Sequence, residues 1–535
     1  MKKTIYLLLI SVSVFSTLHA QTILWANTGG GAADDESYCP ALDNAGNVYI
    51  TGIFSGPALI ASANLTSGGG SDMFTAKYTV AGFSVWAQTG SGFGNSGGHV
   101  LAVDASNNIY VAGEFEDTLT IGTATLISAG ASDIFLARYN SAGTLQWAVR
   151  AGGTGLDAAS SIGTDGGGNI YLTGHFENTF TFGTQSVTSA GGKDLYAARI
   201  DDTGTIVWLT RAGGLADDES RGIAVDVSGS SCIAGHIDSN ATFGSFNLIN
   251  VSGSKDVFAA RLDAGGVFQW AVPGGGNGDD DAYEAAMDNA GNCYVAGYFH
   301  DTASFGSNVM FSNGRDDAFI VKYNSAGVVQ WARQAGDTLG DRIYAISSDA
   351  AGNIVVTGSF EDTVTFGTTT LISSGDKDVF VAEYNSAGTI QWAVRAGGAG
   401  FDRGYGIIND NAGSIYVTGV YEQSADFGSN LLNSAGLRDL FLVKISSPTG
   451  TQENLLSENI FSVYPNPANH SVSVVCSLPQ DETSSFVLFN VMGEKIISEN
   501  ITDKIVIDIS ACAGGIYFYR IVSKQNMETG KLVVR

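Results

Sequence analysis

The chain has 535 residues, of which 70 are Gly and only 7 are Pro, a composition that favours many short strands joined by tight turns. Its formal net charge of -27 at pH 7 argues against nucleic acid or an anionic membrane surface as a partner, and is compatible with cations, basic proteins and neutral glycans. No later stretch approaches the ~18 consecutive apolar residues of a membrane helix, so we expect no transmembrane segment.

The first twenty residues have the organisation of a secretory signal peptide. A basic start at residues 2–3 precedes an apolar stretch at residues 5–15, and residues 18–20 (Leu-His-Ala) offer a cleavage site. The residue directly after this site is Gln21 and not Cys, which argues against a lipid anchor. We therefore expect residues 1–20 to direct export.

Tryptophan recurs along the chain at a nearly constant interval, with spacings of 61, 61, 61, 62, 61 and 61 residues. A fixed period indicates one supersecondary unit copied in series. Two aspartates keep the same phase in every copy, and this common phase favours packing between units as the role of the Trp side chains. The tryptophans are Trp25, Trp86, Trp147, Trp208, Trp270, Trp331 and Trp392. The aspartates are Asp43, Asp104, Asp165, Asp226, Asp288, Asp349 and Asp410, and Asp72, Asp133, Asp194, Asp256, Asp317, Asp378 and Asp439.

Each unit reads as strands, since β-branched and aromatic runs alternate with clusters of Gly, Asn and Ser. No segment shows a sustained helical period. The pattern predicts four principal strands per unit, a to d, with an extra hairpin between b and c. In the second unit these are residues 99–103 (a), 109–113 (b), 118–127 (hairpin), 134–139 (c) and 145–148 (d).

Seven all-β units of about 60 residues predict a β-propeller rather than a solenoid. Residues 23–26 form a d strand that precedes any a strand, and the seventh unit ends with its c strand at residues 441–444. A ring in which the N-terminal strand completes the last blade accounts for both facts and leaves no exposed sheet edge. The expected fold is all-β: a seven-bladed propeller at residues 21–445, closed by the N-terminal strand, with a small β-sandwich after it.

The units also resemble the seven-bladed β-propeller repeats of bacterial surface and secreted proteins. The residues that carry the resemblance are Asp43–Gly52 and the equivalent segments Asp349–Gly358 and Asp410–Gly419, while the fourth repeat departs at residues 230–232. The resemblance implies the fold and leaves the function open, because such propellers have many roles.

A polar linker is expected at residues 446–459, and the short strands of residues 460–535 suggest a β-sandwich. This segment resembles the C-terminal sorting domain of type IX secretion cargo in the Bacteroidota. The resemblance implies the type IX translocon and its sortase as partners, export through the periplasm, removal of the domain, and attachment to the cell surface or release. The matching residues are Pro465, Asn466 and Pro467, Gly493 within 490–495, Gly515 and Tyr517 within 514–518, and Lys531 to Arg535 at the end.

The five cysteines show no CxxC or other metal-binding spacing. Cys39, Cys232 and Cys293 fall in different repeats and read as small buried side chains. Cys476 and Cys512 lie in the C-terminal domain, where either a disulfide or two free thiols are compatible with the sequence.

An acidic position recurs in the loop between strands d and a. The functional interpretation is a ring of carboxylates that binds cations, with Asp35, Asp218 and Asp280 as the metal candidates. The structural interpretation is that each Asp accepts hydrogen bonds from its own loop. Six copies in seven repeats favour the structural role, and without a calcium-loop motif we expect no cofactor, with calcium kept open. The position holds Asp35, Ser96, Asp157, Asp218, Asp280, Asp341 and Asp402.

Three residues further on, the repeats lose their symmetry. If strand a is innermost, this position surrounds the mouth of the central channel, where aromatic and charged groups suit a sugar or a peptide. The alternative is that these side chains pack between blades. The candidate ligand-binding residues are Tyr38, His99, Arg221, Tyr283, Tyr344 and Tyr405, with Ser160 in the third repeat.

The sequence offers little for catalysis. It has no HExxH, GxSxG or P-loop motif, and the d–a segments keep one length, so no loop is extended as a lid. His175 and His236 occupy equivalent b-strand positions. We expect a monomeric, non-enzymatic binding or adhesion module for a glycan or an extracellular protein. The alternatives are an enzyme acting on extracellular polysaccharide and a passive structural protein.

Overall fold

A computed structural model describes residues 21–446, except 252 and 411, and in the C-terminal part residues 461–464, 468, 470–476, 484–490, 495–501, 504–522 and 527–534. The predicted signal peptide therefore lies outside the described residues, as does the predicted linker apart from Ser446. The chain divides into two compact units, Met1–Pro448 and Thr449–Arg535. Within the described residues every regular element is a β-strand.

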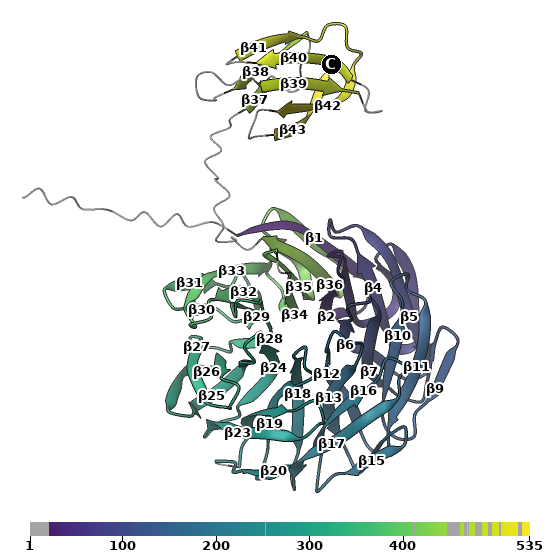
Figure 1. The fold of residues 1–535 in the computed structure, drawn as a ribbon, viewed down its shortest axis with the longest axis vertical. Helices are drawn as coiled ribbons and strands as arrows, with labels where there is room; N and C mark the ends of the chain where they lie inside the picture. The colour runs from purple at the N-terminus through teal and green to yellow at the C-terminus, as the bar shows by residue number, and fades with distance from the viewer. Residues whose placement is uncertain are drawn as a thin grey trace, which may run out of the picture. The chain divides into compact units, whose positions relative to one another are not determined.

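In each repeat of the first unit, four strands pair antiparallel in the order a, b, c, d, and the a strands lie innermost around a common centre (Figure 1). The a strands are β2 (Asp35–Leu42), β6 (Ser96–Val103), β12 (Asp157–Thr164), β18 (Asp218–Val225), β24 (Asp281–Met287), β28 (Arg342–Ser348) and β34 (Arg403–Asn409). The b strands are β3 (Val48–Ile60), β7 (Ile109–Phe115), β13 (Ile170–Phe176), β19 (Ser231–Ile237), β25 (Cys293–Phe305), β29 (Ile354–Phe360) and β35 (Ser414–Phe427).

The c and d strands complete each repeat on the outer side. The c strands are β4 (Ala63–Tyr78), β10 (Asp133–Tyr139), β16 (Asp194–Ile200), β22 (Asp256–Leu262), β26 (Asn308–Tyr323), β32 (Asp378–Tyr384) and β36 (Asn430–Ser446). The d strands are β5 (Ser84–Gly92), β11 (Leu145–Gly152), β17 (Ile206–Gly214), β23 (Phe268–Gly276), β27 (Val329–Ala335) and β33 (Ile390–Gly398).

The hairpin predicted between b and c is present in two forms. In three repeats it is a continuation of the long b and c strands, as in β3 and β4. In the other four it consists of separate short strands: β8 (Thr118–Ile121) and β9 (Ala124–Ile127), β14 (Thr179–Phe182) and β15 (Gln185–Thr188), β20 (Ala241–Phe243) and β21 (Phe246–Leu248), and β30 (Thr363–Phe366) and β31 (Thr369–Ile372). The end of a d strand pairs with the hairpin of the next repeat, as Ala151 does with Phe182, and this links neighbouring repeats; β27 is the exception, since β30 and β31 form a sheet of their own.

The N-terminal strand pairs with the last strand of the repeats. β1 (Thr22–Gly31) lies antiparallel to β36, with Thr22 opposite Ser446 and Gly29 opposite Leu440. Strand β36 therefore extends one residue beyond the predicted boundary at 445, because Ser446 is still paired. Residues 424 positions apart in sequence thus share one sheet, with β1 in the position of a d strand.

Each tryptophan of a d strand reaches the c–d turn of the next repeat, except Trp392, whose Nε1 donates to Glu383. The indole packs on a turn glycine with positive φ, and its Nε1 donates to a carbonyl in or near that turn, as Trp208 does to Ala264 at 3.0 Å. The predicted packing between units is confirmed for these residues. The pairs are Trp25 with Gly82, Trp86 with Gly143, Trp147 with Gly204, Trp208 with Gly266, Trp270 with Gly327 and Trp331 with Gly388.

We expect Gly266→Ala to destabilise the fold by about 2–4 kcal/mol, because φ is +79° and a Cβ would lie 2.6 Å from the Trp208 ring. Gly166→Ala is the matched control, since φ is +71° there and no atom lies within 4 Å of the new Cβ. Urea denaturation of both variants isolates the cost of the indole contact. Equal losses in the two variants would show that the tryptophan packing contributes nothing.

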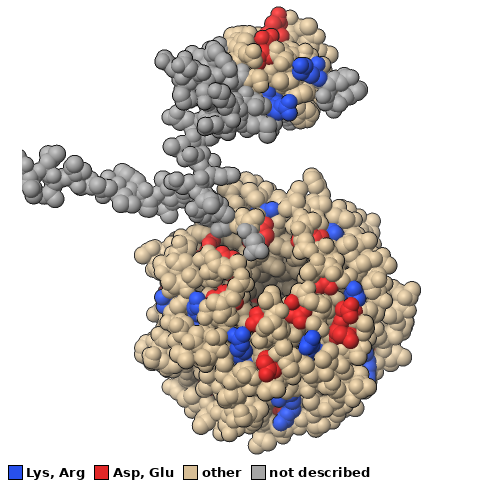
Figure 2. Space-filling model, viewed as in Figure 1, with Lys and Arg blue, Asp and Glu red and all other residues tan. Residues whose placement is uncertain are grey.

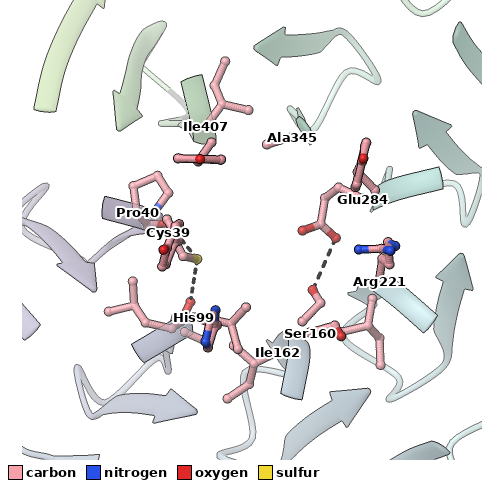
Figure 3. Close-up of a pocket in the computed structure, with 18 of the residues that line it drawn as sticks. Cys39, Pro40, His99, Ser160, Ile162, Arg221, Glu284, Ala345 and Ile407 are labelled. Atoms are coloured by element: carbon pink, nitrogen blue, oxygen red, sulfur yellow. Dashed lines mark hydrogen bonds between the residues drawn. The ribbon is translucent and has the colours of Figure 1, made fainter. Parts of the chain in front are cut away.

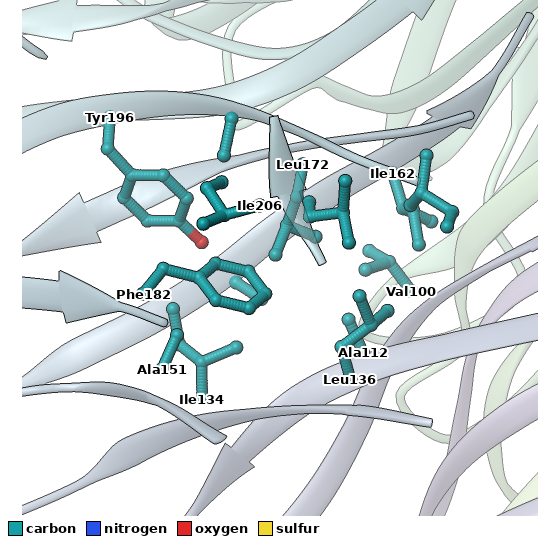
Figure 4. Close-up of a cluster of buried hydrophobic side chains, with 14 of the residues drawn as sticks. Val100, Ala112, Ile134, Leu136, Ala151, Ile162, Leu172, Phe182, Tyr196 and Ile206 are labelled. Atoms are coloured by element: carbon teal, nitrogen blue, oxygen red, sulfur yellow. The ribbon is translucent and has the colours of Figure 1, made fainter. Parts of the chain in front are cut away.

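The core lies between neighbouring repeats. Figure 4 shows one such cluster, in which Val100, Ala112 and Leu136 of the second repeat pack against Ile162 and Leu172 of the third. The a–b turns fix the other end of these strands: Asp43 accepts hydrogen bonds from the backbone of Ala45 and Asn47 and from the Tyr49 hydroxyl. This turn explains why one of the two recurring aspartates keeps its phase.

The C-terminal unit contains two antiparallel sheets that share one buried cluster. Apolar side chains of both sheets form it, including Val472, Phe486 and Leu532. The three-stranded sheet holds β37 (Phe461–Tyr464), β38 (Ser471–Cys476) and β41 (Lys504–Asp508). The four-stranded sheet holds β39 (Ser484–Phe489), β40 (Lys495–Ile501), β42 (Gly515–Val522) and β43 (Met527–Val534).

The residues of the sorting motif, and the two cysteines Cys476 and Cys512, fall only partly within the described residues of this unit. Gly515 begins β42, and the hydroxyl of buried Tyr517 donates to the Ala513 carbonyl at 2.9 Å. Lys531 lies in β43. Cys512 is a free thiol, whereas the side chain of Cys476 lies outside the described residues. Pro465, Asn466, Pro467, Gly493 and Arg535 also lie outside them.

Candidate functional site

A β-bulge interrupts the pairing of strands a and b at the same point in each of the seven repeats. In the first repeat Ser37 opposes Gly52 and Cys39 opposes Thr51, so Tyr38 is the extra residue. A bulge re-aims the side chain it carries, and bulges are common beside binding sites. The bulged residues are Tyr38, His99, Ser160, Arg221, Tyr283, Tyr344 and Tyr405.

These seven residues surround one cavity of about 800 Å³, which the a strands line. This volume is within the range of small-molecule sites. Figure 3 shows labelled side chains, among them His99, Arg221 and Glu284, converging from different strands on the cavity. The face drawn in Figure 2 is hollowed near the centre of the first unit, with acidic and basic side chains around the hollow. The structure thus brings together all the residues of the predicted rim, while ligand binding by them stays a prediction.

The rings of the bulged residues form an almost continuous belt. Tyr38 stacks on His99 with centroids 5.3 Å apart and meets Tyr405 edge-on at 5.2 Å. Tyr344 lies 5.9 Å from Tyr405 and 5.0 Å from Tyr283. Such contacts fix the orientation of the rings. The prediction of a binding rim and the alternative of packing between blades are therefore compatible, because one belt can do both.

Two arginines extend the aromatic belt. The Arg221 guanidinium lies 5.3 Å from the centroid of Tyr283, and that of Arg403 lies 4.7 Å from Tyr344 and 5.4 Å from Tyr405. Such contacts between a cation and an aromatic ring are each worth about 0.5–2 kcal/mol.

Charged groups form a cluster around Arg221. Its guanidinium lies 3.1 Å from both Glu219 and Asp281, and Lys193 contacts Glu219 at 2.9 Å. Burial alone would raise the pKa of Glu219, but His175, Arg221 and the other cations outweigh it and lower this pKa to about 2. Glu219 is thus ionised at neutral pH and neutralises much of the positive charge on this side of the cavity.

Glu284 is the carboxyl side chain found one position beyond the belt. The other repeats place Cys39, Val100, Ser161, Gly222, Ala345 and Gly406 there. Ser161 donates to Glu284 Oε1 at 3.3 Å, a contact between the third and fifth repeats (Figure 3). Burial raises the pKa of Glu284 to about 8, so this carboxyl is mostly protonated at neutral pH and can donate a hydrogen bond.

Sequence reasoning missed four cavity-lining residues: Glu114, His175, Glu284 and Arg403. Glu114 and His175 lie on b strands opposite small residues, since Glu114 pairs with Gly97 and His175 with Ala158. Loss of repeat symmetry, the signal that found the rim, also marks these positions. Using this signal required knowing that the start of strand a and the end of strand b both line the cavity.

The acidic positions of the d–a loops lie inside the protein. Asp35, for example, is 0 % exposed and accepts hydrogen bonds from Gly31 N at 2.6 Å and Ser55 N at 3.1 Å. Burial raises the pKa of all six: Asp35 to about 6, Asp157, Asp218 and Asp402 to about 7, and Asp280 and Asp341 to about 8.

Each of these loop aspartates is close to a second buried carboxyl, the c-strand aspartate of the preceding repeat. Asp133 and Asp157 both flank Gly152, for example, and the negative charge of Asp133 further raises the pKa of Asp157. In the second repeat a serine replaces the loop aspartate, and Ser96 Oγ donates to Asp72 Oδ1 at 3.3 Å. The second repeat therefore has a hydroxyl where the other six have the loop carboxyl.

The three metal candidates Asp35, Asp218 and Asp280 belong to three different pairs of this kind, one in each of three repeats. Among the described residues no group of three or more His, Cys, Asp or Glu side chains is placed to hold a metal ion. Calcium binding by these loops stays an untested option.

Comparison with known proteins identifies the C-terminal unit. Residues 462–535 match the family described as "Secretion system C-terminal sorting domain". The predicted resemblance to type IX secretion cargo is confirmed by this match. A chain with this domain is exported by that system and is secreted or held at the cell surface. In the described part of the chain, no helix is long and apolar enough to cross a membrane.

Two curated proteins are similar to the chain. The first is an uncharacterized WD repeat-containing protein of Acanthamoeba polyphaga mimivirus, 23% identical over 506 residues, which cover 75% of this chain and 36% of the relative. The second is regulatory protein FlaEY of Caulobacter vibrioides, 25% identical over 371 residues, covering 62% of this chain and 36% of the relative. The chain thus spans about a third of the length of these relatives. The likeness supports the repeat, propeller-like nature of the first unit.

Solved structures give only a distant likeness. Sqt1 from Chaetomium thermophilum aligns over 80% of this chain and 100% of its own, at 10% identity and a TM-score of 0.38. The extracellular domain of the putative hybrid two component system BT4673 of B. thetaiotaomicron aligns over 93% of this chain and 80% of its own, at 11% identity and a TM-score of 0.22.

Proposed function

We propose that residues 21–446 form a closed seven-bladed propeller that acts outside the cell as a binding or adhesion module. Its ligand, a glycan or an extracellular protein, binds at the belt of bulged residues around the central cavity. The type IX translocon and its sortase act on the C-terminal domain, which is removed after export. The module works as a monomer, without a cofactor.

The observation that carries this proposal is that the same β-bulge, repeated along the chain, carries different side chains. All seven repeats contain the bulge, yet it presents tyrosine four times and histidine, serine or arginine once each. A purely structural position would favour one residue type, as the tryptophan and aspartate positions do. Unequal groups around one opening suit an asymmetric ligand.

One observation favours a second function, an enzyme acting on extracellular polysaccharide. Glu284 lies in the cavity with its pKa raised to about 8 by burial, and a carboxyl that stays protonated at neutral pH can serve as a general acid. The third function, passive structural display, requires neither a ligand nor a reaction at the cavity.

The test applies the full chain to arrays of glycans and extracellular proteins, with soluble products analysed in parallel. Saturable binding without turnover is the expected result. Release of oligosaccharides that stops in Glu284→Gln would establish the enzyme instead. Neither binding nor turnover on any array would leave the structural role and contradict the proposal.

A further inference from the structure

One buried donor of the cavity lining, Arg403 Nε, has neither a hydrogen-bond partner nor an ion pair among the described residues. The other three buried lining nitrogens without a well-aligned hydrogen bond each have a carboxylate nearby. Arg221 Nε lies 3.1 Å from Asp281, His99 Nε2 lies 3.5 Å from Glu114, and His175 Nδ1 lies 3.8 Å from Glu219. Arginine nitrogens can only donate. No carboxylate oxygen lining the cavity is unpaired in this way within the described residues. A ligand that satisfies Arg403 must offer it an acceptor oxygen, because an unpaired buried donor is costly.

Of the two arginines in the described part of the chain that line the cavity, Arg403 is the one without an ion pair. Arg221 contacts Glu219 and Asp281, Arg342 contacts Asp316, and Arg438 contacts Glu422 and Glu36. No Asp or Glu in the described part of the chain lies within ion-pair distance of Arg403, which instead contacts the rings of Phe401, Tyr344 and Tyr405.

The surroundings of Arg403 are prepared for a planar anion. Its Nη1 lies 3.4 Å from the Tyr405 hydroxyl, and the aromatic rings hold the guanidinium in one orientation. An oriented guanidinium binds a carboxylate through two parallel hydrogen bonds. One uncompensated guanidinium matches the single charge of a carboxylate better than the higher charge of a phosphate group.

The rest of the cavity favours a sugar over a peptide. Six residues that carry hydroxyls are among those that line it: Tyr38, Tyr283, Tyr344, Tyr405, Ser160 and Ser161. Hydroxyls both donate and accept, as sugar hydroxyls do. With its pKa raised to about 8, Glu284 adds a protonated donor that does not repel an acidic sugar at neutral pH.

We propose that the cavity binds a glycan that carries a carboxylate, a uronic acid, with Arg403 as the anchor of that carboxylate. This inference rests on the proposed function and names its ligand class. The net charge of -27 repels acidic polymers at long range. Recognition therefore depends on the local contact, and binding should persist at about 0.15 M salt, where that repulsion is screened.

The test uses short oligosaccharides of galacturonate, glucuronate and mannuronate, each beside its methyl ester, which keeps the sugar ring and removes the charge. Calorimetry with the full chain should show the free acid of at least one sugar bound about tenfold or more tightly than its ester. Arg403→Gln should abolish this preference. Arg438→Gln is the matched control, because Arg438 also lies 4.6 Å from Phe401 but is ion-paired, and it should retain the preference.

Each other outcome has a distinct meaning, provided that thermal unfolding shows both variants folded. Equal binding of acid and ester, or a preference that survives Arg403→Gln, overturns the inference while the cavity remains a glycan site. Binding only of peptides with a free C-terminal carboxylate, or only of sulfated glycans, overturns the ligand class. Binding of nothing on any array contradicts the proposed function as well.

Discussion

The free energy of unfolding is expected to rise by at least about 3 kcal/mol as the pH falls from about 8 to about 5. The six loop aspartates have pKa values raised by burial to between about 6 and about 8, against an ordinary value of 3.8. In this window the folded state takes up protons that the unfolded state does not. The stabilisation is therefore complete below about pH 4 and is lost as the pH rises through the folded-state values.

Two variants test whether the paired carboxyls cause this dependence. Asp157→Asn should flatten it, because one titrating group is removed and the amide can donate to Asp133. Ser96→Asp should steepen it, because the second repeat then gains the carboxyl pair that the other six have. Urea denaturation at a series of pH values measures both slopes. Stability that is constant, or that increases up to about pH 8, would contradict the assignment.

Deletion of residues 21–28 should lower the melting temperature of the first unit by at least about 10 °C. The deletion removes most of the pairing between β1 and β36 and leaves β36 as an exposed edge. It also removes Ile23 and Ala26, which pack on the core of the last repeat, and Trp25, which packs on Gly82 of the first.

Single substitutions in the same strand provide the control for this deletion. Trp25→Ala should destabilise by about 3 kcal/mol, because the indole joins β1 to the c–d turn of the first repeat. Leu24→Ala should change stability by less than about 0.5 kcal/mol, because Leu24 is 52% exposed. Calorimetry that finds the deleted and intact chains unfolding together would exclude a stabilising role for the N-terminal strand.

The repeat architecture was open to prediction because its signals are local and recur seven times. A turn aspartate such as Asp43 caps the turn it belongs to, and Gly82 and Trp25 keep a fixed phase because the same contact recurs six times around the repeats. The order of strands a to d, and the hairpin between b and c, follow from the same runs of residues.

The candidate site was predictable only where a single repeat position varies. The bulged residues were found in this way, whereas Arg403 and His175 were missed because they come from two different strands. Whether strand a or strand b contributes the larger side chain at a paired position depends on the register between the two strands. His175 of strand b, for example, lies opposite Ala158 of strand a. The buried carboxyl pairs were also missed, because Asp133 and Asp157 lie 24 positions apart in sequence and meet only between repeats.

The central claim is that the belt of bulged residues is the binding surface, and the affinity of Tyr344→Ala for the ligand found on the arrays tests it most directly. Tyr344 contacts two neighbouring tyrosines and Arg403, so we expect its removal to weaken binding at least about tenfold. Phe311 is an exposed residue of β26 outside the cavity lining. The control variant Phe311→Ala should therefore bind the ligand as the unaltered protein does. Full affinity in Tyr344→Ala would contradict the claim.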